Sequence, residues 1–222
     1  MADAPPISSR KDRKRAEIVA IAADLFFKEG YAGTSMSQIA AAVGGSKQTL
    51  YNHFQSKEEL LIAVVRDVVE MDPAEHLAGS ASDFRAWLTQ FGCATMQGLT
   101  TYKYISLQRL AAAEALRFPE VGRMFDEIGV EPFYSTMTAK FIEAMDAGIL
   151  RRADPRIAVE QFMEMSAGWL LRRAVWNIRP VPTKAEIEKN VSDAVAAFMD
   201  GYGVQRATGP AKRKAQRPRA TR

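Results

Sequence analysis

The sequence predicts an all-α fold in which a small unit with a helix-turn-helix precedes a larger helical bundle. Apolar residues recur at intervals of three and four in most segments, which is the period of an amphipathic helix. Glycine or proline follows most of these segments and ends them. Capping boxes, with serine or threonine three residues before glutamine or glutamate, mark three helix starts: Ser35/Gln38, Ser56/Glu59 and Thr183/Glu186.

Composition is that of an ordinary globular protein. The 222 residues are 47% hydrophobic and 25% charged, enough to bury a core without disulfides or metal. The single cysteine, Cys93, excludes an internal disulfide framework and is expected to be buried filler in an apolar helix. No apolar run approaches the roughly 18 residues of a membrane span, and no signal peptide is evident. We therefore expect a cytoplasmic protein without membrane contact.

Charge is distributed unevenly along the chain. The net charge is +2 for residues 1–56, −5 for residues 57–203 and +7 for residues 204–222. Basic ends on an acidic body predict that a polyanion is bound at the ends and not across the whole surface.

The first helix is predicted over residues 14–29, and Gly30 ends it. Before it, residues 10–15 contain five bases and one acid. This run predicts an arm on the DNA backbone, although a solvated helix start would have the same composition. The apolar stripe of the first helix consists of Ile18, Ile21, Ala22, Leu25 and Phe26.

The stretch that begins at Ser35 predicts a helix-turn-helix. Its first helix ends at Gly44-Gly45, because glycine enters the left-handed cap conformation without strain. Ser46 can cap a second, short helix over residues 47–54. Two short helices joined by a tight glycine turn are typical of the motif whose second helix enters the major groove of DNA.

On the second helix, Leu50 and Phe54 are expected to face the interior. An ordinary helical hairpin with a solvated polar side would have the same spacing. Two details favour DNA instead: the helix is too short to be stable alone, and its outward side carries no carboxylate that phosphates would repel. The residues expected on the outward side are Gln48, Thr49, Asn52 and His53.

This stretch resembles the amino-terminal domain of TetR-type transcriptional regulators. The resemblance covers roughly residues 14–62, and its most specific part is Leu50-Tyr51-x-His53-Phe54-x-x-Lys57-x-x-Leu60. It implies a homodimeric regulator, most simply a repressor, that binds a palindromic double-stranded DNA operator. Release by a small apolar or amphipathic effector of unknown identity is also implied.

The residues expected to contact DNA fall into two groups. Helix-turn-helix proteins read base edges with the start of the second helix, which here presents Lys47, Gln48, Thr49 and Asn52. Ser46 at the cap and Ser35 and Ser37 beside a helix N-terminus suit phosphate. The resemblance implies that Tyr51, His53 and Lys57 bind phosphates as well.

A fourth helix is predicted from Ser56 towards Met71, where Asp72-Pro73 breaks it. It is the only covalent connection between the motif and the rest of the chain. The resemblance implies that it transmits the effector signal.

The remainder reads as consecutive helices. One runs from Ser82 to near Gly98, and others cover residues 102–117, 119–128 and 132–147. A long one starts at Asp154-Pro155 and reaches Trp176, and the last starts at Thr183. The stretch from Phe118 to Phe133 resembles the AefR-like C-terminal subtype of the same family.

Two sets of residues in this part are candidates for a function. Aromatic and methionine stripes are core by pattern, and the resemblance implies that part of them lines an effector cavity: Trp87, Phe91, Phe133, Met137, Met165 and Trp169. The apolar sides of the last two long helices are too wide to be covered by one neighbouring element. This predicts that they also form a homodimer interface. The interface residues expected are Phe162, Trp176, Val191, Ala194 and Phe198.

We expect no catalytic, metal-binding or cofactor-binding residue. His53 and His76 are far apart, and neither stands in ligand spacing with a cysteine or carboxylate. Two alternatives stay open: a DNA-binding regulator without a small-molecule effector, and an all-helical enzyme, which would need polar groups converging in the bundle. The expected domains are a disordered segment (1–9), the helix-turn-helix domain (10–56), the effector and dimerisation domain (57–203) and a disordered basic tail (204–222).

Overall fold

A computed structural model describes residues 9–69 and 83–204 of the chain. Within these ranges the predicted all-α class is confirmed, and regular structure is helical apart from one backbone bridge between Leu150 and Gly203. Several predictions lie outside the described residues: disorder at 1–8, the helix end at Met71-Asp72-Pro73, His76, and the tail beyond 204.

The N-terminal helices are α1 (Arg10–Gly33), α2 (Met36–Ala42), α3 (Lys47–Tyr51) and α4 (Lys57–Val69). α1 starts earlier than predicted, because Ser9 and Asp12 form a capping box, so the basic run is part of the helix. Its contact with the DNA backbone stays a prediction. Gly30, expected to end the helix, forms a kink at φ 78° inside it. α3 is shorter than predicted, since the chain turns at Asn52 and carries Phe54 inward.

The C-terminal helices are α6 (Phe84–Leu99), α7 (Tyr102–Glu114), α8 (Pro119–Phe125), η2 (Asp126–Val130), α9 (Glu131–Asp146), α10 (Pro155–Ser166), α11 (Gly168–Val175) and α12 (Lys184–Tyr202). α7 ends three residues before the predicted 117. The predicted break before residue 132 is instead the π-helical turn η2, which joins α8 to α9 without interruption. The predicted single helix from 155 to 176 is broken at Ala167.

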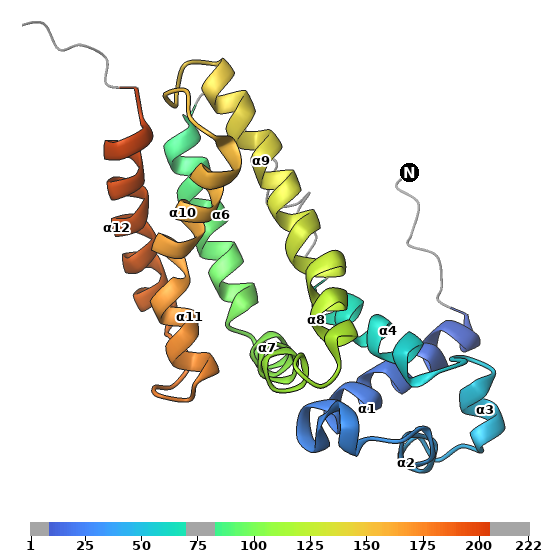
Figure 1. The fold of residues 1–222 in the computed structure, drawn as a ribbon. Helices are drawn as coiled ribbons and strands as arrows, with labels where there is room; N and C mark the ends of the chain where they lie inside the picture. The colour runs from blue at the N-terminus through green and yellow to red at the C-terminus, as the bar shows by residue number, and fades with distance from the viewer. Residues whose placement is uncertain (1–8, 70–82, 205–222) are drawn as a thin grey trace, which may run out of the picture.

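Two hydrophobic cores organise these helices. The first combines α1 to α4 with Leu107, Leu110 and Ala111 of α7 and Val121 of α8, so it extends past the predicted domain boundary at residue 56. The second lies among α6, α9, α10 and α12. Figure 1 shows the corresponding halves, with α1 to α3 at the lower right and the long helices of the second core at the upper left.

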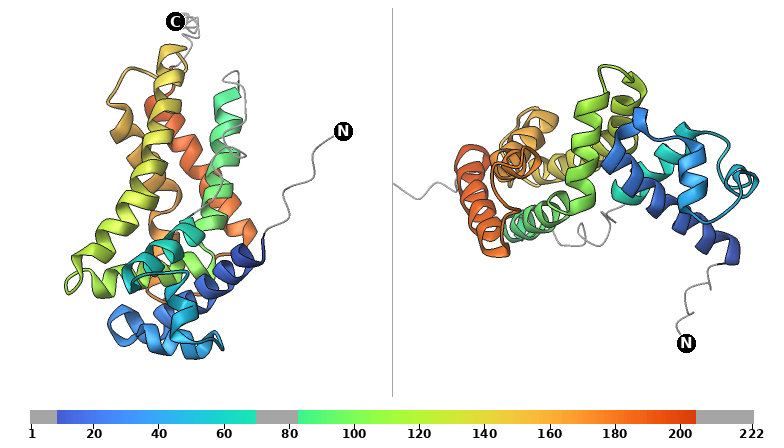
Figure 2. Two further views of the ribbon diagram at one scale, coloured as in Figure 1. Left: turned by 90° about the vertical axis from the view of Figure 1, so that its right-hand side faces the viewer. Right: turned by 90° about the horizontal axis from the view of Figure 1, so that it is seen from below.

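α7 lies between the two halves. It packs on α1 and α4 on one side and on α11 on the other. The right-hand view of Figure 2 shows it, in green, between the blue α1 and the orange and red C-terminal helices. The two halves are therefore joined by α7 packing as well as by the chain connection through α4.

Candidate nucleic-acid interface and interior cavity

Local hydrogen bonds fix the helix-turn-helix. The predicted capping box at Ser35 is present, with the Ser35 hydroxyl accepting from the Gln38 amide and the Ser35 amide donating to the Gln38 side chain. Gly44 takes the left-handed conformation at φ 67°, which makes the tight turn. Ser46 Oγ then accepts from the Thr49 amide at 3.1 Å and starts α3.

Burial of Leu50 and Phe54 directs the other side of α3 to solvent. Leu50 is 2% exposed and Phe54 is fully buried, with the Arg15 guanidinium 4.5 Å from its ring centroid. Of the residues predicted to face outward, Gln48 and Asn52 are exposed, whereas Thr49 and His53 are half-buried; Lys47 at the start of the helix is exposed as well. The orientation predicted for α3 is thus observed at its two anchors.

Two outward amides are joined to each other. Gln48 Nε2 donates to Asn52 Oδ1 at 3.1 Å, one turn along the same exposed surface. This leaves the Gln48 oxygen, one Gln48 N–H and both Asn52 N–H groups for another partner. Bidentate amide groups of this kind match the N6/N7 edge of adenine.

The remaining predicted DNA contacts differ in accessibility. Ser37 is exposed and Tyr51 is 39% exposed. The hydroxyl groups of Ser35 and Ser46 are engaged in the caps, the latter also with Thr49 Oγ1 at 3.0 Å. His53 is half-buried, and its Nδ1 is turned to the interior.

Lys57 is placed differently from a free surface lysine. Its Nζ donates to the carbonyl oxygens of Tyr31 (2.8 Å) and Thr34 (3.1 Å) and lies 4.1 Å from the Tyr31 ring centroid. Burial lowers the pKa of Lys57 below its usual value, and the nearby Glu114 carboxylate partly opposes this. One N–H of the ammonium remains for a phosphate, while the other two hold the end of α1.

A cavity of about 660 Å³ lies between the two halves. This volume is within the range of small-molecule sites. Its walls come from α4, α6, α7, the η2 region, α9, α10 and α11. One wall continues an aromatic stack in which Phe91 and Phe133 face each other with centroids 5.8 Å apart, and Trp87 lies behind Phe91 at 5.3 Å.

Polar side chains lie among the apolar residues that line the cavity. Tyr104, Gln108 and Tyr134 contribute two phenols and an amide. Burial raises the pKa of both tyrosines, and at Tyr134 the nearby Glu164 and Glu160 raise it further. Both phenols therefore stay protonated at neutral pH and can donate hydrogen bonds.

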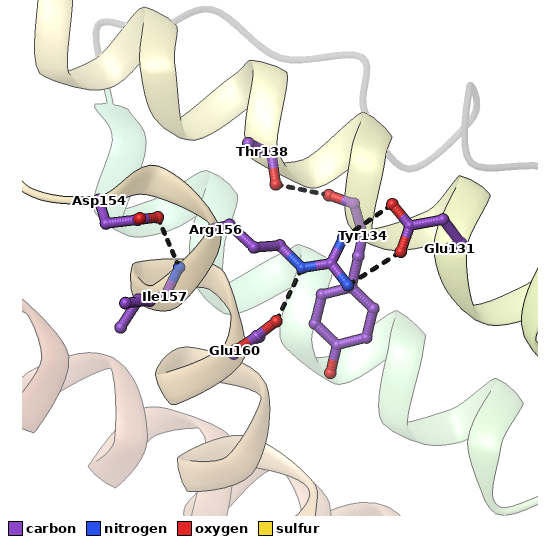
Figure 3. Close-up of polar contacts among 7 residues, drawn as sticks. All are labelled: Glu131, Tyr134, Thr138, Asp154, Arg156, Ile157 and Glu160. Atoms are coloured by element: carbon purple, nitrogen blue, oxygen red, sulfur yellow. Dashed lines mark hydrogen bonds and ion pairs between the residues drawn. The ribbon is translucent and has the colours of Figure 1, made fainter.

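Tyr134 is held from outside the cavity (Figure 3). The Arg156 guanidinium lies 4.6 Å from the Tyr134 ring centroid and makes a bidentate pair with Glu131 on α9. Arg156 Nε also donates to Glu160 of α10 at 2.8 Å. Asp154 caps the start of α10 by accepting from the Ile157 amide, as predicted.

The predicted cavity residues separate into three groups. Phe91 and Phe133 line the cavity. Trp87 and Met137 do not, because they are buried in the second core. Met165 and Trp169 do not either, since they point to solvent and are 44% and 58% exposed.

Most of the predicted interface residues are buried in the interior of one subunit. Phe162, Val191 and Phe198 are fully buried and Ala194 is 6% exposed, because the stripe of α12 packs on α6 and α10. These side chains cannot face a second subunit in this structure. Trp176 is the exception, since it is 59% exposed and also lines the cavity.

Sequence reasoning missed most of the polar lining. Tyr104, Gln108 and Ala112 stand four residues apart and share one side of α7. That spacing, on the side of α7 opposite the buried Leu110, was a usable signal. Among the described residues, no group of three or more His, Cys, Asp or Glu could hold a metal ion. No described helix is long and apolar enough to cross a bilayer.

Sequence comparison agrees with this architecture. Residues 18–64 match the family of bacterial regulatory proteins named after TetR. Residues 86–204 match the AefR-like transcriptional repressor C-terminal domain. The chain belongs to the TetR family. Both predicted resemblances are thereby confirmed, including the AefR-like one.

Several known regulators are similar to this chain over different lengths. A regulator from Mesorhizobium loti is 30% identical with a TM-score of 0.74, covering 89% of this chain and 100% of that one. The flavonoid-responsive regulator FrrA is 29% identical with a TM-score of 0.73, covering 88% and 99%. The transcriptional repressor KstR2 of Rhodococcus jostii is 30% identical over 116 residues, so the chain spans about half the length of that curated relative.

Proposed function

We propose that this TetR-family regulator is a homodimeric, cytoplasmic repressor that binds a palindromic operator and is released by a small apolar or amphipathic ligand. The observation that carries the DNA-binding part is α3, a five-residue helix whose exposed side presents Lys47 and the Gln48–Asn52 pair without a carboxylate. A helix of this length is held by its cap and anchors, so its outward side chains are pre-positioned for a groove.

The base-reading role is proposed for the exposed residues Lys47, Gln48 and Asn52, with Thr49 beside them. Lysine suits the O6/N7 edge of guanine, and the two amides suit adenine. Phosphate contacts are proposed for Tyr51, His53 and the Ser35–Ser37 helix start, together with the third N–H of Lys57. Ser46 contributes mainly as the cap of α3.

A dimer is supported by exposed apolar side chains on α10, α11 and the segment after them. Among these are Met165 (44% exposed), Trp169 (58%), Trp176 (59%), Ile178 (56%) and Val181 (51%). Trp169 and Trp176 pack edge to face at 6.3 Å, so they form one continuous apolar surface. A patch of this kind is characteristic of a protein–protein contact, and light scattering at micromolar concentration should give a dimer mass.

The ligand is proposed to be a planar aromatic molecule with hydroxyl or carbonyl groups. A flat ring can lie against Phe91 and Phe133, where the aromatic stack ends at the cavity. Tyr104 and Tyr134 can donate to its oxygen atoms. The name of FrrA, a flavonoid-responsive regulator of similar fold, supports testing flavonoids first.

The test is footprinting on DNA upstream of the protein's own gene at ~150 mM salt, where non-specific basic binding is weak. A two-fold symmetric footprint that disappears with a hydroxylated flavonoid supports the whole proposal. A symmetric footprint that resists flavonoids and long-chain fatty acids would favour a regulator without an effector. Equal affinity for operator and random DNA would refute the DNA-binding assignment.

A further inference from the structure

We propose that Arg172 selects the ligand of the interior cavity, and that this ligand is an aromatic acid whose negative charge replaces Glu164 as the partner of Arg172. This rests on the proposed function and deepens it, because it adds a charge to the aromatic ligand. Three charged side chains line the cavity in the described part of the chain, namely Arg66, Glu164 and Arg172. The last two form an ion pair with each other.

The ion pair spans the break between α10 and α11. Glu164 lies in the last turn of α10 and Arg172 on α11, and Arg172 Nη2 donates to Glu164 Oε2 at 3.1 Å. Gly168 lies beneath the pair, where a Cβ would be 2.7 Å from the Glu164 oxygen and 2.9 Å from the Arg172 nitrogen. The missing side chain at residue 168 therefore leaves room for the two charges to meet at the cavity wall.

The break itself is held from α12. Asn190 Nδ2 donates to the Ser166 carbonyl oxygen at 2.6 Å, and Ala167, the next residue, is buried. Asn190 thereby satisfies a carbonyl group that the end of α10 leaves without a partner inside the helix. Because the backbone at the break is held, Glu164 and Arg172 can exchange partners by rotating their side chains while the cavity wall stays in place.

The pair is weak enough to be exchanged. The Arg172 and Glu164 side chains are 49% and 65% exposed, and ion pairs with this exposure contribute little to stability. Arg172 donates only one of its five N–H groups to Glu164. An acidic group in the cavity can accept two parallel hydrogen bonds from the guanidinium, which is a stronger arrangement than the single bond to Glu164.

A phenol lies close to the same point. Burial raises the pKa of Tyr134, and the Glu164 carboxylate raises it further, so the two groups are near each other. The protonated Tyr134 hydroxyl can donate to an anion that takes the place of Glu164. Phe91 and Phe133 provide a flat apolar surface for the rest of the ligand. An aromatic ring with one acidic group therefore matches both parts of the lining.

Two fluorescent probes that differ by one negative charge allow a direct test. The dye 1-anilinonaphthalene-8-sulfonate (ANS) carries a sulfonate that N-phenyl-1-naphthylamine (NPN) lacks, and their aromatic skeleton is the same. Both are titrated into the full-length protein, and ANS is tested for competition with NPN. Ala112→Trp, which fills the cavity from α7, should weaken the binding of both probes.

Two substitutions change the ion pair. Arg172→Gln should weaken ANS about tenfold and leave NPN within about twofold of wild type, because only the charged probe loses a partner. Glu164→Gln should instead tighten ANS about threefold, because the competing carboxylate is removed. An NPN affinity close to that of wild type shows that the cavity is intact in each variant.

Two further variants are matched controls. Glu160→Gln removes an acid one turn earlier on α10 that pairs with Arg156 and does not line the cavity (Figure 3). It should leave both probes unchanged, which separates exchange at Arg172 from a general change of charge. Arg66→Gln removes the other arginine of the lining and should weaken ANS less than Arg172→Gln does.

Three results would overturn the role of Arg172. One is an equal loss of both probes in Arg172→Gln, which would make this residue a support of the wall and not a partner of the charge. Another is a preference for ANS that depends on Arg66 and not on Arg172. The third is ANS that does not compete with NPN, because the cavity then excludes the charged group. NPN binding that Ala112→Trp does not weaken refutes the ligand part of the proposed function instead.

Discussion

The helix-turn-helix and the cavity differ in how far apart in the chain their parts lie. α2, its turn and α3 are specified by neighbours within four residues, such as Ser35 with Gln38 and Ser46 with Thr49. The cavity is lined by side chains from Arg66 to Trp176, which meet only when seven regions of helix are packed. Local contacts therefore determine the surface proposed to read DNA, whereas the proposed ligand cavity depends on packing between helices that are distant in the chain.

The largest expected effect on stability comes from replacing a phenylalanine by alanine next to the helix-turn-helix. The same replacement in the cavity wall should cost less. Phe54→Ala should lower the free energy of unfolding by ~3–5 kcal/mol, because a fully buried ring is removed from a filled core. Phe133→Ala should cost only ~1–2 kcal/mol, because that ring already faces the hollow and has fewer neighbours to lose. Urea denaturation followed by circular dichroism measures both values. Equal losses of unfolding free energy in the two variants would contradict the distinction between a filled and a hollow region.

A second prediction separates two residues of the DNA-reading unit. Gln48→Ala should relax the preference at one operator position, costing ~1–3 kcal/mol there, without changing stability, because Gln48 is exposed. Lys57→Ala should weaken all sequences alike and lower the salt slope by about one. It should also destabilise the protein, since the Tyr31 and Thr34 carbonyls lose their donor.

The measurement is a binding series over single-base operator variants at several salt concentrations, with unfolding measured in parallel. If Lys57→Ala changes the preferred base and Gln48→Ala does not, the assignment of roles is wrong. If Lys57→Ala leaves stability unchanged, the contacts of its ammonium with α1 contribute nothing measurable.

The smallest effect is expected at the outer side of the cavity. Arg156→Ala should lower the free energy of unfolding by less than ~1 kcal/mol, because its ion pairs are partly exposed and screened. It should nevertheless raise the pKa of Tyr134 further, since Arg156 is the nearby charge that lowers it. Ultraviolet difference titration of the phenols measures this. Arg152→Ala, which breaks only a pair with Asp146, is the control and should leave the Tyr134 titration unchanged.

Local signals explain which elements the sequence could predict. The caps at Ser35, Ser46, Asp154 and Thr183 were placed correctly because a short side chain and an amide three residues later define them. The start of α1 at Arg10 was not predicted, although Ser9 stands three residues before Asp12, because the basic run that follows Ser9 also fits a segment that contacts DNA. The capping signal at Ser9 has the same spacing as at the helix starts that were predicted.

Partners in space could not be predicted in the same way. The stripe of α12 through Val191 and Phe198 shows that one side is buried, but not whether by a neighbouring helix or by another subunit. Likewise, Trp87 and Phe91 share one stripe of α6, and only packing decides that Phe91 reaches the cavity while Trp87 stays behind it. Amphipathic periodicity gives the direction of burial and leaves the identity of the neighbour open.

The π-helical turn η2 has a consequence for insertions and deletions. A turn of this kind accommodates one residue more than a regular α-helix, and the flanking segments can keep their register. Here the additional residue lies where Ile128, Gly129 and Val130 form the cavity wall, and a Cβ at residue 129 would come within 2.9 Å of Val69. Deleting one residue between 126 and 130 should therefore leave α8 and α9 in place and reshape only the wall. At this point in the chain, the shape of the cavity wall depends on the number of residues in the turn as much as on their side chains.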